Sequence, residues 1–465
     1  MSDSKNEKKQ YGMDLTQGSI LNKMLRFCVP LMFSSILQLL FNAADIVVVG
    51  RFAGDASLAA VGSNVALINL LTNLFIGLSV GVNVLAARYY GAKEDNELSK
   101  TVHTAICVGI LSGLFLNVFG VIGAKQILVW MKTPKNVLPL ATLYLRVYFF
   151  GMTAMMVYNF GSALLRAMGD TKRPLYFLLG SGIVNLVLNM LFVIVFRMDV
   201  VGVGLATVIS QWISGILVLM CLIKEQGAMH LNISQIRIDR TMIFKILKIG
   251  IPAGIQGVVF SLSNVVIQTS VNSFGSVVMA GNSAAQNLEG FVYMAMNAFH
   301  QGAVTFTSQN MGAGKKNRIL KITIVALLCV IVVGEVFGNG MFILGRSLLG
   351  IYSKSPSVVE AGMTRLKMIC TIYALCGIMD VMVGVLRGLG YSVMPMIVSL
   401  FGACGLRLLW IATIFSTEKY HTIEMLYLSY AVSWIITVSI HVICYCVVGR
   451  KRGIFDLKTH QIARK

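Results

Sequence analysis

The sequence predicts an all-α integral membrane protein with twelve transmembrane helices in two six-helix lobes, related by a pseudo-two-fold axis along the membrane normal. Three observations lead to this fold class: the composition, a series of long apolar runs, and an internal repeat. Hydrophobic residues make up 56% of the chain, charged residues make up 12%, and the mean hydropathy is +0.78. A soluble protein of this length carries far more charge, so the chain belongs in a membrane.

The apolar runs define the expected helices, because about 20 apolar residues are enough to cross a bilayer. Twelve runs reach that length, at 26–50, 57–87, 101–124, 140–163, 175–196, 202–223, 247–272, 277–309, 319–345, 363–386, 392–415 and 424–448. Residues 1–25 are polar and lack the pattern of a cleaved signal peptide, so we expect a cytoplasmic tail.

The distribution of positive charge predicts the orientation. With both termini in the cytoplasm, about 27 of the 39 Lys and Arg residues fall on the cytoplasmic side, as the positive-inside rule favours. We expect a multi-pass protein of the cell inner (plasma) membrane. The net charge of +20 also suits nucleic-acid binding, but the basic residues lie in short clusters between apolar runs, so we expect no nucleic-acid partner.

An internal repeat divides the runs into two sets of six. Six of the seven prolines pair between the halves at separations of 221 or 222 residues: Pro30 with Pro252, Pro134 with Pro356, and Pro174 with Pro395. Because six is even, both units keep the same orientation in the membrane. In transporters built from such parallel repeats, the substrate site lies near the midplane between them.

The repeat and the runs together predict five parts of the chain. These are a cytoplasmic tail at 1–25, a first lobe at 26–223, a cytoplasmic linker at 224–246, a second lobe at 247–448, and a basic cytoplasmic tail at 449–465. The linker is assigned because it is the longest polar segment between two apolar runs.

Acidic residues within the apolar runs are the first candidates for function, since a charge in hydrocarbon costs about 2.5–3.5 kcal/mol. Four of the nineteen acids qualify: Asp45, Glu289, Glu335 and Asp380. Glu335 lies on no polar stripe, and we expect it to pair with another helix. Arg407 is the one base deep in a run, and it could neutralise one of the acids.

Two helices carry polar stripes at helical spacing. In the first run, Gln38, Asn42 and Asp45 share one face. In the eighth run, a second stripe is formed by Gln286, Glu289, Tyr293, Asn297 and His300. Both faces should turn away from lipid, and the second should line the interior of the second lobe.

The depth of each residue follows from the helix direction and the rise of about 1.5 Å per residue. Asp45, Asn189 and Thr207 fall at a similar depth in the outer half, and Asn185 lies one turn from Asn189. These oxygen-rich side chains could bind a small cation. They could equally hydrogen-bond a protonated Asp45.

Signals of catalysis are weak in this sequence. The nine Cys and six His are scattered, without the paired spacing of metal ligands. The segment GAGKK lacks the first glycine and the preceding strand of a phosphate-binding loop. We therefore expect no catalytic residues, no metal and no cofactor, and hence no enzyme.

Several segments resemble the multidrug and toxic compound extrusion (MATE) transporters. They are CVPLMFSSILQLLFNAADIVVVGRFAG in the first helix, GAK and GAGKKN after the second and eighth helices, and LLRAMGDTKRP and VLRGLG after the fourth and tenth. The similarity covers the chain from about Gly18 to Arg452.

The resemblance implies export of substrates, often organic cations, against an inward flow of protons or sodium. It also implies that Asp45, Asn185, Asn189 and Thr207 occupy the family's cation site in the first lobe. Many members have an acid where this chain has Asn189, which favours a proton over sodium as the coupling ion. Glu289 and Asp380 match acids found in other branches of the family, and the repeat partner of Asp380 is Asn159.

The function expected is a secondary active antiporter for multidrug efflux, acting as a monomer on a small-molecule substrate and surrounded by membrane lipid. The residues expected at the substrate cavity or in second-lobe coupling are Gln38, Asn42, Gln286, Glu289, Tyr293, Asn297, His300 and Asp380. The alternative is a flippase for lipid-linked saccharides, which related folds perform. Its anionic substrate should require several bases in the cavity, whereas the sequence suggests one buried base against four buried acids.

Overall fold

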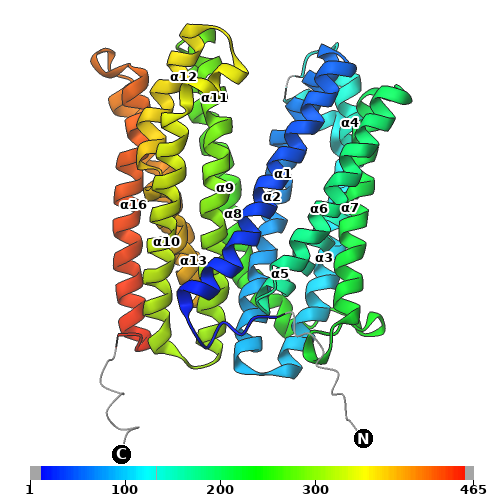
Figure 1. Ribbon diagram of the computed structural model, residues 1–465, viewed down its shortest axis with the longest axis vertical. Helices are drawn as coiled ribbons and strands as arrows, with labels where there is room; N and C mark the ends of the chain where they lie inside the picture. The colour runs from blue at the N-terminus through cyan, green and yellow to red at the C-terminus, as the bar shows by residue number, and fades with distance from the viewer. Residues whose placement is uncertain (1–11, 132, 456–465) are drawn as a thin grey trace, which may run out of the picture.

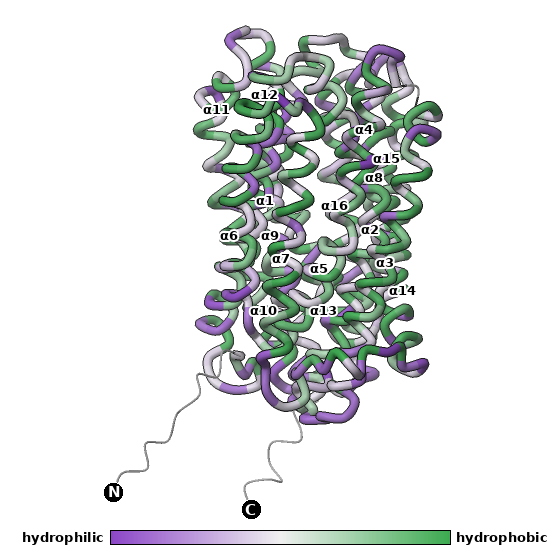
Figure 2. The backbone as a smooth tube through the Cα atoms, turned by 90° about the vertical axis from the view of Figure 1, so that its right-hand side faces the viewer, coloured by the Kyte–Doolittle hydropathy of each residue, from purple (hydrophilic) through white to green (hydrophobic). Residues whose placement is uncertain are grey.

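The computed structural model describes residues 12–131 and 133–455, which form helices and turns with no strand among them. The helices stand side by side in two groups that draw apart toward one end (Figure 1). Both ends of the described chain lie at the other end, which we call the terminal end; the end where the groups separate is the open end. Apolar residues cover the flanks, and polar residues gather at both ends (Figure 2).

The first group is built from seven long helices and one π-helical segment. They are α1 (Ile20–Phe52), α2 (Asp55–Ala92), α3 (Asp95–Trp130), α4 (Leu138–Phe149), α5 (Met152–Ala167), α6 (Lys172–Asn189), η1 (Met190–Val195) and α7 (Asp199–Lys224). Two single turns follow in the linker, η2 (Gly227–Met229) and η3 (Ile233–Gln235).

The second group repeats this order. It contains α8 (Arg240–Asn272), α9 (Ser276–Gly312), α10 (Lys316–Ile343), α11 (Gly345–Tyr352), α12 (Pro356–Ile369), η4 (Cys370–Ile372), α13 (Ala374–Gly388), α14 (Val393–Ser399), η5 (Leu400–Gly405), α15 (Leu406–Trp410), η6 (Ile411–Phe415), η7 (Glu418–Tyr420) and α16 (Ile423–Arg452).

These elements confirm the predicted all-α membrane fold. Nine helices in the described chain are long and apolar enough to cross a membrane, and two helix pairs bent by 46° bring the number to eleven. The bent pairs are α4 with α5 and α12 with α13, which hold corresponding places in the two lobes. The predicted span at 277–309 lies within α9, which has 37 residues but is less apolar because it carries the predicted polar stripe.

The two lobes exchange parts of their first helices. At the terminal end, α1 packs against α9 of the second lobe, where Phe27 and Phe306 meet edge to face with ring centroids 5.7 Å apart. Toward the open end, α1 packs instead on α6 of its own lobe. The same exchange occurs in α8, which begins on α2 of the first lobe and continues along α14 and η5.

Small residues close the lobes against each other at the terminal end. A Cβ on Gly77 would lie 2.2 Å from the backbone nitrogen of Gly254, and one on Gly81 would lie 2.5 Å from the Ile246 carbonyl oxygen. Only glycine permits such an approach of α2 to α8. Close backbone contact between small residues is a principal source of helix association where water is absent.

Hydrogen bonds related by the repeat also join the lobes there. The Arg88 guanidinium donates to the Gly388 carbonyl at 3.2 Å, and the Gln309 amide donates to the Ala167 carbonyl at 2.6 Å. Both donors and both acceptors lie 221 positions apart in the sequence. The two bonds are thus equivalents across a pseudo-two-fold axis, as in an isologous interface.

The segments that precede α1 and α8 each pack on the opposite lobe. Leu15 is fully buried, its amide donates to Gln309 at 3.2 Å, and its carbonyl accepts from Asn310 at 3.1 Å. In the linker, the backbone N–H of Asn232 donates to the ring Nε2 of His103 at 3.1 Å. The predicted tail at 1–25 therefore includes an ordered packing segment, while 1–11 and 456–465 lie outside the described residues. The predicted linker 224–246 is also shorter, because α8 already begins at Arg240.

Candidate functional site

Uncharged amides form a polar surface where the lobes separate. The last polar contact between α2 and α8 joins Asn73 to Ser261 at 3.2 Å. One turn further toward the open end, Asn69 on α2 and Asn264 on α8 are both exposed. The two helices therefore carry polar side chains away from their own lobes at the point where they diverge.

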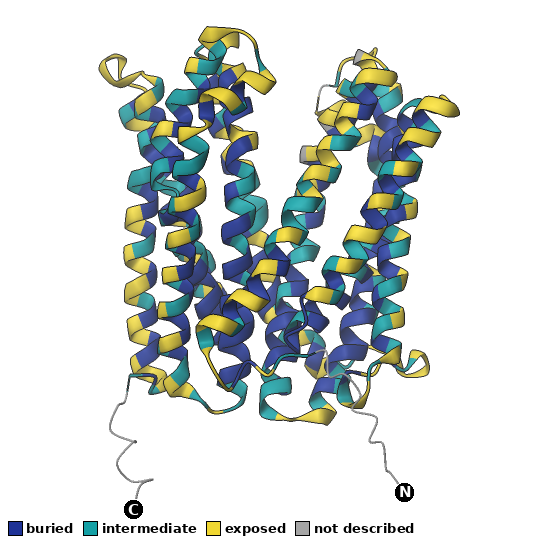
Figure 3. Cartoon of the chain, viewed as in Figure 1, coloured by how far each residue is buried: buried dark blue, intermediate teal, exposed yellow. Residues whose placement is uncertain are grey.

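The matching helices α1 and α9 repeat this pattern. They still approach at Leu39 and Gly290, where a Cβ on Gly290 would lie 3.9 Å from the leucine side chain. Beyond that point their amides are exposed, and Figure 3 shows the separation of α1 from α9 with exposed positions along it. With the first pair they form the amide surface, which consists of Gln38, Asn42, Asn69, Asn264, Gln286 and Asn287.

The structure brings the four residues of the predicted first-lobe group into contact. Asn189 on α6 donates its amide to the Asp45 carboxylate on α1 and, at 3.3 Å, to Asn185. Asn185 in turn donates to the Thr207 hydroxyl on α7 at 3.5 Å. Asn185 and Asn189 are buried, whereas Asp45 is partly exposed, one turn beyond Asn42 of the amide surface.

Two features of this group matter for its chemistry. No Lys or Arg in the described chain forms an ion pair with Asp45. The carbonyl oxygen of the Asn189 amide is buried and has no hydrogen-bond donor. An acceptor without a donor beside a carboxylate leaves room for a proton or a small cation to satisfy both.

Glu289, by contrast, is neutralised within the protein. Its carboxylate accepts two hydrogen bonds of 2.7 Å from the guanidinium of Arg365 on α12. The same guanidinium donates to Asn282 at 2.7 Å, and Asn282 accepts from Tyr427. This buried, bidentate pair ties α9, α12 and α16 together near the open end.

The other members of the α9 stripe lie in different surroundings. His300 is buried and its ring Nδ1 lies 2.6 Å from the backbone carbonyl of Asp380. Tyr293 lies against the Asp380 side chain, and Asn297 accepts from Gln301 at 3.0 Å. The stripe is therefore split: Gln286 is exposed on the amide surface, Glu289, Tyr293 and His300 contact neighbouring helices, and Asn297 is bonded within α9.

Arg407 forms no ion pair with an acid in the described chain, so the role that the sequence left open to it is not the one it has. Its Nε donates to the Ser433 hydroxyl at 2.8 Å, and its guanidinium lies 4.1 Å from the ring centre of Tyr430. Hydroxyl and aromatic partners stabilise a buried guanidinium without a counter-charge. Glu335 also differs from expectation, since it accepts from Asn339 of its own helix at 2.8 Å.

The expectation of a single buried base against four buried acids was wrong as well. Three arginines of the second lobe are buried: Arg365, Arg387 and Arg407. Arg387 donates to Gln256 at 2.8 Å. Arg365 was not predicted from the sequence, because it lies near the start of its run and its partner Glu289 is distant in sequence. The signal that could have revealed it is a basic residue inside a predicted span.

Comparison with known proteins identifies the family. The MatE family model matches the chain twice, over residues 30–191 and 252–413. The chain belongs to the MatE family. The two matches begin 222 residues apart, which is the offset of the proline pairs, and the resemblance to MATE transporters is confirmed.

Relatives of this MATE transporter are described as multidrug proteins. It is 28% identical over 397 residues to the probable multidrug resistance protein YpnP of Bacillus subtilis (strain 168), covering 85% of this chain and 88% of the relative. It is 21% identical to the multidrug export protein MepA of Staphylococcus saprophyticus, with 80% and 83% covered. The relatives indicate a transporter of the multidrug efflux family rather than an enzyme.

Solved structures support the same fold. One described as an outward-facing conformation of a multidrug resistance MATE family transporter has a TM-score of 0.89 with this MATE chain. The two are 18% identical, and the match covers 96% of this chain and 100% of the other. Within the described residues, no group of three or more His, Cys, Asp or Glu side chains could hold a metal ion.

The surroundings of Asp45 in this MATE transporter include residues that the sequence analysis did not select. Tyr144 and Tyr148 on α4 lie near the carboxylate, and their ring centroids are 5.8 Å apart. Gln211 on α7 contacts Tyr148. The spacing of four between the tyrosines places both on one face of α4, which is the signal that could have revealed them.

Proposed function

We propose that this MATE transporter is a secondary active antiporter that exports organic compounds, cationic or amphipathic, in exchange for protons. Sodium is the second candidate for the coupling ion. The protein would act as a monomer in the plasma membrane with both termini in the cytoplasm, so that the open end faces outward. The lobes would alternate between this arrangement and one that opens at the terminal end.

The observation that carries the proposal is the unpaired Asp45 in the first lobe. A carboxylate at this depth is costly unless something neutralises it, and no basic side chain in the described chain does so. The orphaned oxygen of Asn189 beside it offers a second acceptor. Glu289 is neutralised by a fixed arginine, whereas Asp45 would be neutralised by a cation that binds from the outside and is released to the inside.

A proton is favoured because the group holds a single carboxylate. Its other oxygens belong to Asn185, Asn189 and Thr207, which carry no formal charge. A bound proton would turn Asp45 into a donor for a neighbouring acceptor such as the Asn189 oxygen. Sodium binding would gain strength from a second acid, which this group lacks.

Transport would require that the ion and the substrate favour different arrangements of the lobes, because a ligand with equal affinity for both shifts nothing. The link in this chain is α1. It carries Asp45 and Asn42 toward the open end and packs against α9 of the second lobe toward the terminal end. A change in how Asp45 is held by α6 would therefore be felt at the contact between lobes.

The amide surface favours neutral or cationic substrates. Its six exposed members are uncharged and can donate and accept hydrogen bonds, while apolar side chains lie between them. The three buried arginines favour the alternative of a flippase for lipid-linked saccharides. Arg365 is already neutralised by Glu289, however, while Arg407 is held by hydroxyl and aromatic groups and Arg387 by the Gln256 amide, so the antiporter remains the proposal.

Reconstitution into vesicles tests the proposal. The purified protein should move a cationic dye when a proton gradient is imposed and should not respond to a sodium gradient alone. Asp45→Asn should lose the gradient-driven component. Glu335→Gln is the matched control, because it removes an intramembrane carboxylate held within its own helix. Dye movement by Asp45→Asn at the wild-type rate would refute the role of Asp45, and transport of a lipid-linked saccharide without the dye would favour the flippase.

A further inference from the structure

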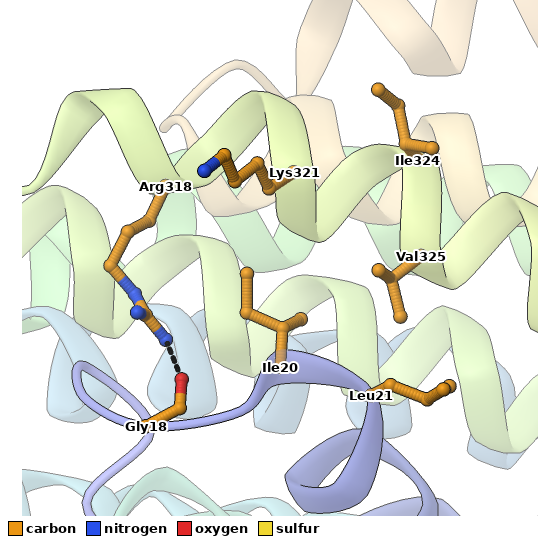
Figure 4. Close-up of a pocket in the computed structure, with 7 residues that line it drawn as sticks. All are labelled: Gly18, Ile20, Leu21, Arg318, Lys321, Ile324 and Val325. Atoms are coloured by element: carbon orange, nitrogen blue, oxygen red, sulfur yellow. Dashed lines mark hydrogen bonds between the residues drawn. The ribbon is translucent and has the colours of Figure 1, made fainter.

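A groove lies at the terminal end between the beginnings of α1 and α10. It has a volume of about 420 Å³ and is lined by Gly18, Ile20, Leu21, Arg318, Lys321, Ile324 and Val325. Figure 4 shows the two basic side chains on one side and the apolar side chains further along α10 and α1. Its volume falls in the range of small-molecule sites.

The polarity of the groove changes along the helix axis. Arg318 and Lys321 belong to the first turns of α10, whereas Ile324 and Val325 lie one turn further toward the middle of the span. Leu21 and Ile324 are 51% and 48% exposed, so the apolar part opens to the side of the helix bundle. A ligand that fits must place an anionic group near the helix ends and hydrocarbon along the bundle.

The charge at the start of α10 is uncompensated. The first turn of α10 contains no acid, and neither Arg318 nor Lys321 forms an ion pair in the described chain. One Arg318 nitrogen donates to the Gly18 carbonyl at 3.1 Å, and its Nε is buried without a partner. Basic groups are also unfavourable at the positive end of a helix dipole, which increases the benefit of an anion here.

The corresponding place in the first lobe differs in both respects. Glu97 stands 221 positions before Arg318 and forms an ion pair of 2.9 Å with Lys100, the partner of Lys321 in the repeat. The linker also covers that side of α3, since Met229 and Leu231 are buried and η2 packs on α3. The same groove is thus neutral and filled in one lobe, but basic and open in the other.

From this we infer that the groove between α1 and α10 binds an anionic phospholipid, with the phosphate on Arg318 and Lys321 and an acyl chain along Ile324, Val325 and Leu21. Basic pockets between transmembrane helices at the membrane surface are suited to such headgroups. The bound lipid would hold the start of α1 against α10 of the other lobe. The basic groove is a poor match for the basic C-terminal residues 456–465, which carry Lys458, Arg464 and Lys465.

Native mass spectrometry of the full-length protein in detergent would test the site with phosphatidylglycerol and phosphatidylcholine of the same chain length. The protein should retain phosphatidylglycerol in preference. Arg318→Gln with Lys321→Gln should weaken that binding about 30-fold, or about fivefold for each cation removed. The control pair Arg237→Gln with Arg240→Gln removes two exposed charges from the same end and should leave binding unchanged.

Other outcomes would overturn the inference. Equal binding of the two lipids, or equal loss in both pairs of variants, would show that the groove does not select an anionic lipid. Binding of inorganic phosphate that displaces phosphatidylglycerol would identify a free-phosphate site. An increase in lipid binding after removal of residues 1–11 or 456–465 would show that the chain's own tail occupies the groove. The charge-conserving exchange Arg318→Lys with Lys321→Arg should bind lipid as the wild type does and separates charge loss from misfolding.

Discussion

The group around Asp45 in the first lobe and the corresponding set of positions in the second lobe carry opposite charges, at different members of the set. In the first lobe, Asp45 is held by Asn189 and lies near Asn185 and Thr207. The two matches to the family model begin and end 222 residues apart, and at this offset the residue corresponding to Asn185 in the second lobe is Arg407. The residues corresponding to Asp45, Asn189 and Thr207 are Ile267, Ile411 and Ser429.

The difference shows how a duplicated fold can divide its tasks. The first-lobe group has an acid without an ion-pair partner in the described chain, so under the proposed function its neutralising cation would come from solution. At the corresponding place in the second lobe the positive charge belongs to the protein itself: it is the guanidinium of Arg407, which lies among Ser433, Tyr430 and Trp434. A fixed charge cannot exchange, so of these two places the proposed mechanism uses the one at Asp45.

The sharpest test of this comparison removes each charge in turn. Asp45→Asn should lower gradient-driven dye efflux by about 100-fold or more, because the ion then has no differential affinity for the two arrangements. Arg407→Gln, which can still donate to Ser433, should change efflux by about twofold or less, because a charge fixed in the protein is not one of the exchanged ligands. Equal losses in the two variants, measured in the same vesicles, would contradict the proposed division.

The second prediction concerns the other buried charges of the second lobe. Glu289→Gln should lower the free energy of unfolding by about 3–5 kcal/mol, because it leaves the buried Arg365 without its counter-charge. Replacing both, as Glu289→Gln with Arg365→Met, should restore most of that loss. Unfolding in detergent measures both effects, and a Glu289→Gln protein of wild-type stability that no longer transports would point to coupling instead.

Adding a charge to the first lobe should sharpen the comparison further. Asn189→Asp places a second carboxylate beside Asp45, and sodium affinity should rise by about tenfold because oxygen-ligated cations gain from charged ligands. Dye efflux under a sodium gradient measures the change. The control Asn264→Asp adds the same charge on the amide surface, outside the group, and should leave the sodium response at the wild-type level.

The smallest effect is expected where the lobes are alike. Arg88→Ala removes one of the two symmetry-related hydrogen bonds at the terminal end and should favour its opening by about 1 kcal/mol. Gln309→Ala removes the other together with the bond that Gln309 accepts from the Leu15 backbone amide, so its effect should be somewhat larger, and the double variant should show about the sum of the two effects. Fluorescence transfer between dyes on α2 and α9 at that end reports the opening; an effect confined to one of the two variants would show that the bonds are not equivalent.

Much of this architecture could be predicted from the sequence because it depends on local patterns. Apolar length gave the spans, the prolines gave the repeat, and helix rise placed Asp45 level with Asn189 and Thr207. In each case the argument needed only one helix at a time, or two helices of known direction.

What could not be predicted depends on which helix faces meet. Periodicity shows that Glu289 and Tyr293 share a face of one helix, but it does not show that Arg365 approaches the first and Asp380 the second. The partner of Arg407 stayed open for the same reason: a base in an apolar run needs a partner, and the sequence does not reveal that hydroxyl and aromatic groups supply it. The burial of Leu15 was equally hidden in a polar segment.

The exchange of first helices between the lobes bears on how the protein arose. Because α1 begins against α9 and α8 begins against α2, the first half of each unit's first helix packs on the other unit. A solitary unit would leave that half uncovered, whereas two identical copies would cover one another in the same way. The exchange is therefore the arrangement expected if two six-helix chains first formed a homodimer and their genes were later fused. A circular permutant that starts at the linker should form the same contacts of α1 with α9 and of α8 with α2.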